Sequence, residues 1–148
     1  MRKRSISASE SGVSRALDLA RVLLVHGDLA PRLTLKTILE AGGYFVDVAA
    51  TPSEALSKLD EGQYELVISD SDLGRRSAGR NVLAYARIKT YRPATAILTS
   101  YEPRAKRTSV RRRDQVSIHT EDVPLLLGEV AELIGARASR RYRHPVAN

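Results

Sequence analysis

Short apolar runs alternate with amphipathic helical patterns along most of this chain, and this alternation constrains the fold more than any other feature. An apolar run without polar interruption is typical of a parallel strand that is covered on both faces. Strands that alternate with helices at this spacing favour an α/β fold, a doubly wound five-stranded parallel sheet with helices on both faces. The expected strands are residues 22–25, 44–49, 66–68, 94–99 and 116–118.

Helix signals fall between these runs. Asp28 is placed to cap a helix that has Pro31 in its first turn and ends at Gly42. Thr51 and Glu54 have the spacing of a capping box at the start of the next helix. The remaining helical patterns cover residues 81–87, 102–113 and 123–134, with Gly135 following the last.

The 148 residues suggest one domain, which we place at residues 20–137. Residues 1–19 are expected to form a basic, disordered arm, and residues 138–148 a basic, polar tail. The chain contains no cysteine, which excludes disulfides and thiolate metal sites. No apolar run approaches the roughly 20 residues that span a bilayer, so we expect a soluble cytoplasmic protein without a membrane partner.

The net charge of +7 is concentrated in one internal segment and the two ends of the chain. Residues 102–113 hold six basic side chains against one acidic side chain. This segment is either a solvated helix face or a surface for an acidic protein or nucleic acid. Only Tyr101 lies close enough to offer base stacking, so the nucleic-acid signature is incomplete. The partner-binding candidates are Arg104, Arg107, Arg111 and Arg112.

Polar side chains lie at or just after several of the predicted strands. Because parallel strands end at the same edge of a sheet, we expect these side chains to share one edge. His26 and His119 are either a metal-binding pair or ordinary loop histidines, and the lack of firm carboxylate partners favours the second interpretation. The full set at this edge is His26, Asp28, Asp70, Thr99 and His119.

Residues 21 to about 137 resemble the receiver domain of two-component response regulators. Residues 66–70 are similar to the third strand of that family, which ends in the phosphoacceptor aspartate, here Asp70. Residues 96–101 are similar to the fourth strand with its switch hydroxyl, here Thr99. The resemblance implies a flavodoxin-like (βα)5 fold with strand order 2-1-3-4-5. It also implies phosphorylation of Asp70 with the help of Mg²⁺.

The sequence departs from the receiver pattern in three places. His26 and Gly27 stand where the family has an acidic pair after the first strand. The family's lysine at the end of the fifth strand falls near His119 and Thr120, and its aromatic switch residue near Val116. The acidic pair and the lysine, which make phosphorylation fast in the family, are therefore missing. The aromatic residue that transmits the phosphorylated state is missing as well.

The remaining carboxylates near the expected metal position are Asp28, Asp70 and Asp72. Hard cations prefer oxygen ligands, so the loss of two carboxylates predicts weak Mg²⁺ binding. Asp72 compensates in part if its carboxylate reaches the metal beside Asp70. We expect phosphorylation at Asp70 to be impaired.

These residues predict a stand-alone receiver-like signalling module of a phosphorelay that acts by protein–protein contact. Its expected partners are a sensor histidine kinase or another signalling protein, with a homodimer possible through the last two helices. The alternative is a nucleic-acid-associated protein that uses residues 104–113 and the basic tails. An enzyme finds little support, because the sequence has no Gly-rich phosphate loop, nucleophile elbow or metalloprotease motif.

Overall fold

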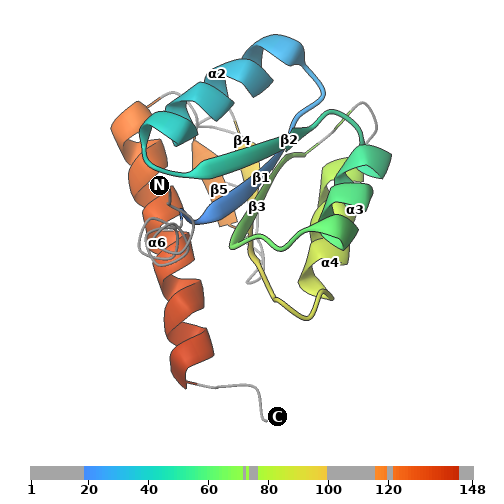
Figure 1. Cartoon of the computed structure of the whole chain (residues 1–148). Coiled ribbons are helices and arrows are strands. Elements are labelled where there is room, and N and C mark those ends of the chain that lie inside the picture. The colour runs from blue at the N-terminus through green and yellow to red at the C-terminus, as the bar shows by residue number, and fades with distance from the viewer. Residues whose placement is uncertain (1–18, 72, 74–76, 100–115, 120–121, 144–148) are drawn as a thin grey trace, which may run out of the picture.

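The computed structural model describes residues 19–71, 73, 77–99, 116–119 and 122–143. It contains a five-stranded parallel sheet flanked by helices (Figure 1), so the predicted α/β fold is confirmed. The sheet order is β2-β1-β3-β4-β5, which the receiver resemblance implied. The strands are β1 (Arg21–Val25), β2 (Phe45–Ala49), β3 (Leu66–Asp70), β4 (Ala94–Thr99) and β5 (Val116–His119).

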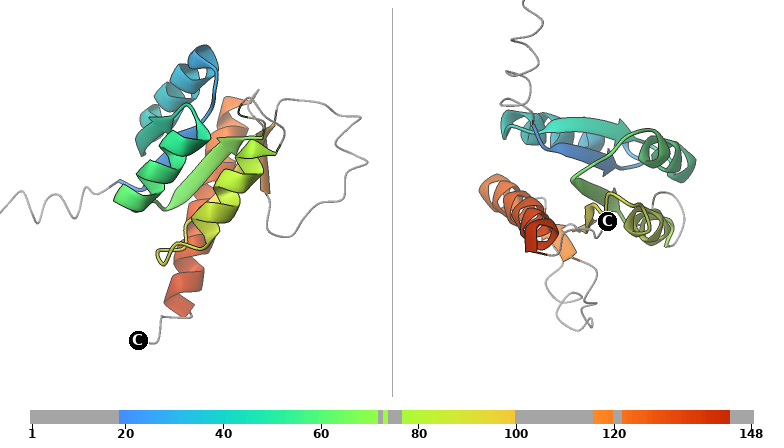
Figure 2. Two further views of the ribbon diagram at one scale, coloured as in Figure 1. Left: turned by 90° about the vertical axis from the view of Figure 1, so that its right-hand side faces the viewer. Right: turned by 60° about the horizontal axis from the view of Figure 1, so that its bottom comes forward.

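Within the described residues, four helices cover the two faces of the sheet. Helices α2 and α6 pack on one face, and α3 and α4 pack on the other (Figure 2). This doubly wound arrangement follows from right-handed crossovers between parallel strands. The helices are α2 (Leu29–Ala41), α3 (Pro52–Glu61), α4 (Ala78–Arg87) and α6 (Val123–Arg143).

Strand β1, which lies between β2 and β3, shows why the apolar runs are continuous. Successive side chains of a strand point to opposite faces of the sheet. Val22 and Leu24 lie in the core beneath α2 and α6, whereas Leu23 and Val25 lie in the core beneath α3 and α4. All four side chains are fully buried. Burial of each contributes about 1.5–3 kcal/mol relative to exposure.

The two predicted helix caps have different outcomes. The Thr51 Oγ1 accepts a hydrogen bond from the Glu54 N–H at 3.1 Å, and the Glu54 carboxylate accepts one from the Ala50 N–H at 2.8 Å. The capping box is therefore confirmed, although its return bond reaches the residue before the cap. Asp28 occupies the cap position of α2, so the predicted start of this helix is confirmed, but its side chain makes no capping bond. The Asp28 backbone N–H instead donates to His26 Nδ1 at 3.1 Å, and the residue is exposed.

Two helices are longer than the sequence pattern predicted. Helix α4 begins at Ala78, three residues before the expected start. Helix α6 continues through Gly135 to Arg143, so residues 138–143, which were expected to belong to a tail, are helical. A glycine inside a helix costs only about 1 kcal/mol, which does not end a helix that is anchored on both sides.

Some predictions fall on residues outside the described part of the chain. These are the N-terminal arm over residues 1–18 and the predicted helix over residues 102–113 with its arginines. A dimer through the last two helices involves that second segment and stays a prediction. Among the described residues, no helix is long and apolar enough to cross a membrane.

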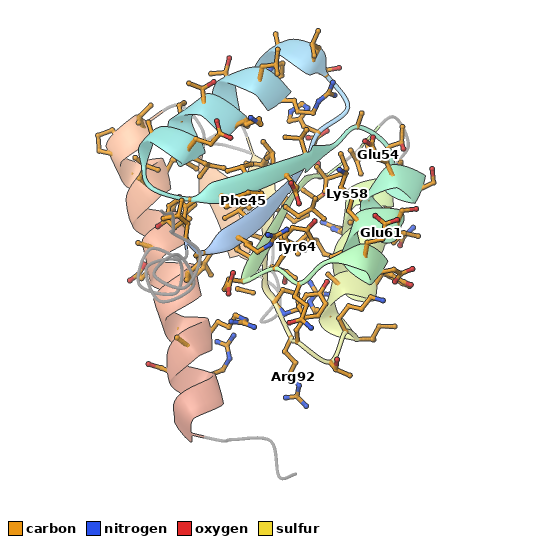
Figure 3. The ribbon with its side chains drawn as sticks, in the orientation of Figure 1. Phe45, Glu54, Lys58, Glu61, Tyr64 and Arg92 are labelled. Atoms are coloured by element: carbon orange, nitrogen blue, oxygen red, sulfur yellow. The ribbon has the colours of Figure 1, made fainter. Side chains whose placement is uncertain are left out.

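A polar cluster closes the edge of the sheet at which the strands begin. The Arg21 guanidinium stacks over the rings of Phe45 and Tyr64, 4.5 Å and 5.5 Å from their centroids (Figure 3). The Tyr64 hydroxyl donates to Asp47 Oδ2 at 2.8 Å, and Arg21 Nη2 lies 3.4 Å from the same oxygen. Burial raises the pKa of Tyr64, and the Asp47 carboxylate raises it further. Tyr64 therefore keeps its proton to higher pH in the folded protein than in the unfolded chain.

Candidate functional site

The candidate site is the carboxyl edge of the sheet, where the parallel strands end. Asp70 is the last residue of the central strand β3 and is paired in register with Leu98 of β4. On its other side, Val25 of β1 pairs with Ser69 of β3. This register places His26, the residue after β1, level with Asp70 at the end of β3. The predicted gathering of these residues at one edge is confirmed for the backbone.

Thr99 and His119 end the next two strands and are paired in register. They extend the carboxyl edge from β4 to β5. The switch role predicted for Thr99 and the metal role considered for His119 depend on their side chains. Those side chains lie outside the described part of the structure, so both roles stay predictions.

The main chain around Asp70 is held tightly. The Asp70 side chain is half-buried, and its Oδ2 accepts a hydrogen bond from the Leu73 N–H at 3.4 Å. Leu73 is buried and has a φ of 45°, in the left-handed region that costs a non-glycine residue about 1–3 kcal/mol. The fully buried Ser69 donates its hydroxyl to the Asp70 carbonyl at 2.9 Å. Strained backbone of this kind is common beside functional groups.

Gly79 lets helix α4 begin directly against this strand end. A Cβ atom at position 79 would lie 1.9 Å from the Asp70 carbonyl oxygen and 2.8 Å from the Ser71 carbonyl oxygen. The Gly79 N–H donates to the Ser71 oxygen at 2.9 Å. Any side chain at position 79 would therefore push α4 away from the segment that presents Asp70.

The end of β1 carries a cation instead of an acidic pair. Arg32 Nη1 donates to the carbonyl oxygens of His26 at 2.9 Å and Gly27 at 3.4 Å. His26 Nδ1 accepts a hydrogen bond from the Asp28 N–H at 3.1 Å. His26 and Gly27, which stand where the receiver family has an acidic pair, are thus held by the guanidinium of Arg32, the fourth residue of α2.

The predicted metal ligands are only partly described. Asp28 and Asp70 lie at the carboxyl edge, whereas Asp72 is outside the described residues. Within the described residues, no group of three His, Cys, Asp or Glu side chains is placed to hold a metal ion. The chemistry of the donor set fits Mg²⁺ poorly, because β1 ends in an imidazole and a glycine with an arginine bonded to them.

Sequence analysis missed three residues that shape this edge: Arg32, Ser69 and Gly79. The signal for Gly79 was its position just before a helical pattern, where a glycine often permits close backbone approach. Arg32 lies in a helix that was correctly predicted, but nothing in its spacing indicated a bond to the preceding loop. Ser69 could be recognised only as a polar residue between the apolar run 66–68 and Asp70.

No protein-family model matches this sequence, and no curated protein matches it either. Solved structures do match. A CheY-like response regulator receiver domain from Methanospirillum hungatei JF-1 has 25% sequence identity and a TM-score of 0.70, and the match covers 83% of this chain and 99% of that chain. The receiver domain of the hybrid histidine kinase CckA has 26% identity and a TM-score of 0.62, covering 77% and 98% of the two chains.

A response regulator receiver protein from Sinorhizobium medicae WSM419 has 19% identity and a TM-score of 0.69, with coverage of 82% of this chain and 98% of that chain. At that identity the likeness shows the fold alone. The three matched chains are all receiver proteins or domains, and the match covers nearly the whole of each. The resemblance that the sequence indicated is therefore confirmed.

Proposed function

We propose that this chain, which has the fold of response regulator receiver domains, is a receiver-like signalling module with Asp70 as its phosphoacceptor. The observation that supports this function is the position of Asp70 at the end of the central strand, between the ends of β1 and β4. The Asp70 carboxylate there is half-buried and accepts a hydrogen bond from the Leu73 N–H, and the Asp70 carbonyl accepts one from the Ser69 hydroxyl.

The proposed reaction at Asp70 is a simple phosphoryl transfer. A carboxylate oxygen of Asp70 attacks the phosphorus of an acyl phosphate or phosphohistidine, and the bond from phosphorus to the leaving group breaks. The leaving group departs with the electron pair, and an aspartyl phosphate remains. Catalysis of such a transfer depends mainly on positioning and on neutralising the oxygens of the phosphoryl group.

We propose that Mg²⁺ binds weakly at this edge. The residues that would hold it are Asp70, Asp28 and Asp72, and the bound ion would supply positive charge to the phosphoryl oxygens. The guanidinium of Arg32, bonded to the His26 carbonyl, places a like charge near any metal at the end of β1. Phosphorylation is accordingly slow and needs high Mg²⁺ concentrations.

The proposed output is contact with another signalling protein, for which a sensor histidine kinase is one candidate. Two leucines on α2 support a protein contact beside the carboxyl edge. Leu29 and Leu33 are 61% and 50% exposed, lie one turn apart and directly follow the loop that contains His26 and Asp28. Exposed apolar side chains grouped in this way commonly mark protein interfaces.

The proposal is tested by incubating the full chain with acetyl phosphate and MgCl₂ and measuring the intact mass. We expect a phosphate adduct that is absent in Asp70→Asn and present in Asp60→Asn. Asp60 is a matched control because it is an exposed carboxylate on α3, bonded to Lys89 and Tyr85 rather than placed at the carboxyl edge. An adduct that persists in Asp70→Asn, or none at any Mg²⁺ concentration, would contradict a phosphoacceptor role.

A further inference from the structure

The edge opposite Asp70, where the parallel strands begin, carries a second feature that the receiver proposal does not use. Helix α6 passes this amino edge and extends beyond it (Figures 1 and 2). Its last side chains in contact with the core are the partly buried Leu133 and Ile134, and the helix then runs on to Arg143. The two edges are about 15 Å apart, because β3 has five residues at roughly 3.3 Å each.

One arginine joins this helix to the domain. Arg137 donates from Nε to the Arg92 carbonyl at 2.9 Å and from Nη2 to the Tyr91 carbonyl at 2.6 Å. Both acceptors lie in the turn between α4 and β4. Arg92 itself is exposed, and Figure 3 shows its side chain extending away from the sheet. Arg137 therefore attaches α6 to the turn that carries Arg92, 45 residues away in the sequence.

Further arginines continue this charge along the helix. Arg140 is exposed and follows Arg137 by three residues, a spacing that places both on one side of a helix. We call Arg92, Arg137 and Arg140 the basic face. Arg141 and Arg143 belong to the same helix, and residues 133–148 contain no Asp or Glu.

Helix electrostatics explain only part of this arrangement. Cations near a helix C-terminus interact favourably with its dipole, but that effect is confined to the last turn. It accounts for arginines at positions 140–143, and the two carbonyl bonds of Arg137 account for that residue, but neither effect accounts for Arg92. Like charges brought together on one helix side are mildly destabilising on their own. Three described carboxylates near this edge have other partners: Asp60 is bonded to Lys89 and Tyr85, Asp47 to Tyr64 and Arg21, and Glu65 to the Arg21 N–H.

We propose that the basic face binds the phosphate backbone of nucleic acid, independently of the chemistry at Asp70. Guanidinium groups form paired hydrogen bonds with phosphate oxygens, and a run of arginines without acidic residues matches a polymer with one charge per nucleotide. An acidic peptide presents fewer and less regular charges. The contact is to the backbone, so it is not specific for base sequence.

The test is fluorescence anisotropy of a labelled 20-base-pair DNA duplex titrated with the full chain at several salt concentrations. We expect log K to fall with log[salt], with a slope of about −0.9 for each phosphate contacted. The variant Arg92→Gln/Arg140→Gln should bind about tenfold more weakly and reduce the magnitude of the slope by about 2. This variant retains Arg137. The two oxygens that accept hydrogen bonds from Arg137 are main-chain carbonyls of Tyr91 and Arg92, so the attachment of α6 is preserved.

The matched control is Lys36→Gln/Arg80→Gln, which removes the same net charge from α2 and α4 without touching the basic face. It should retain the affinity of the wild-type chain within about twofold. The proposal is overturned if the duplex does not bind at 20 mM salt, or if the control loses as much affinity as the basic-face variant. Equal competition by polyglutamate would assign the face to acidic proteins instead. None of these outcomes depends on phosphorylation of Asp70.

Discussion

His26, Gly27 and Arg32 show how single residues change the chemistry of a common fold. They keep the loop after β1 in place, since the Arg32 guanidinium bonds to the carbonyl oxygens of the other two. They also place an imidazole and a glycine, with a guanidinium bonded to their carbonyl oxygens, where the receiver family has two carboxylates. The sequence was sufficient to predict the loss of the acidic pair. It was not sufficient to predict the cation, because that depends on where a helical side chain reaches in three dimensions.

Restoring the acidic pair should strengthen Mg²⁺ binding. In His26→Asp/Gly27→Asp, two added carboxylates at the end of β1 should tighten the apparent affinity by about tenfold, since hard cations favour charged oxygen ligands. The measurement is the Mg²⁺ concentration for half-maximal change in the NMR spectrum. Thr34→Asp/Thr37→Asp adds the same charge on exposed positions of α2 and should change little. Equal affinities in the wild type and the restored variant would refute our explanation of weak binding.

Gly79 should be intolerant of even the smallest side chain. A methyl group would overlap the Asp70 carbonyl oxygen, so Gly79→Ala should lower the free energy of unfolding by about 1–3 kcal/mol. Gly128→Ala in α6 is the matched control, because no atom lies within 4 Å of its added Cβ. That variant should be stabilised by roughly 0.5–1 kcal/mol through helix propensity. Urea denaturation measures both, and similar effects of the two substitutions would contradict the close approach of α4.

The helices show where sequence patterns succeed and where tertiary contacts decide. The start of α3 was predictable because Thr51, Pro52 and Glu54 supply a complete local signal. The end of α6 was not, because Gly135 indicated a stop while the helix continues and Arg137 bonds to the turn before β4. Aspartate is a preferred residue at the cap position, yet the Asp28 side chain makes no hydrogen bond to the first turn of α2.

The two cap positions provide a direct comparison. Thr51→Ala removes a hydrogen bond to the Glu54 N–H and should cost about 1 kcal/mol. Asp28→Ala removes no capping bond and should cost less than half as much. Both free energies are measured by urea denaturation at neutral pH. A loss for Asp28→Ala as large as that for Thr51→Ala would show that the Asp28 side chain caps α2 in solution.

At the scale of the whole molecule, the sheet separates two chemically different edges. The carboxyl edge holds Asp70, and the amino edge holds the cluster around Tyr64 and the basic face. The five strands and their parallel direction were predictable from apolar runs. Their order came from the resemblance to receivers, because local patterns do not encode which strands become neighbours. The sequence was sufficient to predict which residues follow the strands. It was not sufficient to predict which other residues they contact.

Because of Tyr64, the free energy of unfolding should depend on pH in the alkaline range. Its pKa is raised in the folded protein by burial and by Asp47, whereas an unfolded tyrosine ionises near pH 10. The unfolded state therefore loses a proton first, and the free energy of unfolding falls as pH rises above about 10. Tyr64→Phe should reduce the steepness of this fall by up to about 1.4 kcal/mol per pH unit. An unchanged slope between pH 10 and 11 would contradict the buried, hydrogen-bonded hydroxyl.

The central claim is that Asp70 and the strand ends around it form the signalling site. The most direct test is residue-resolved NMR of the labelled chain, recorded before and after addition of acetyl phosphate and MgCl₂, with Asp70→Asn as the reference. We expect chemical-shift changes that centre on Asp70 and spread to the ends of β1 and β4. These changes should be absent in Asp70→Asn. Shifts that persist in Asp70→Asn, or that centre on the amino edge, would contradict it.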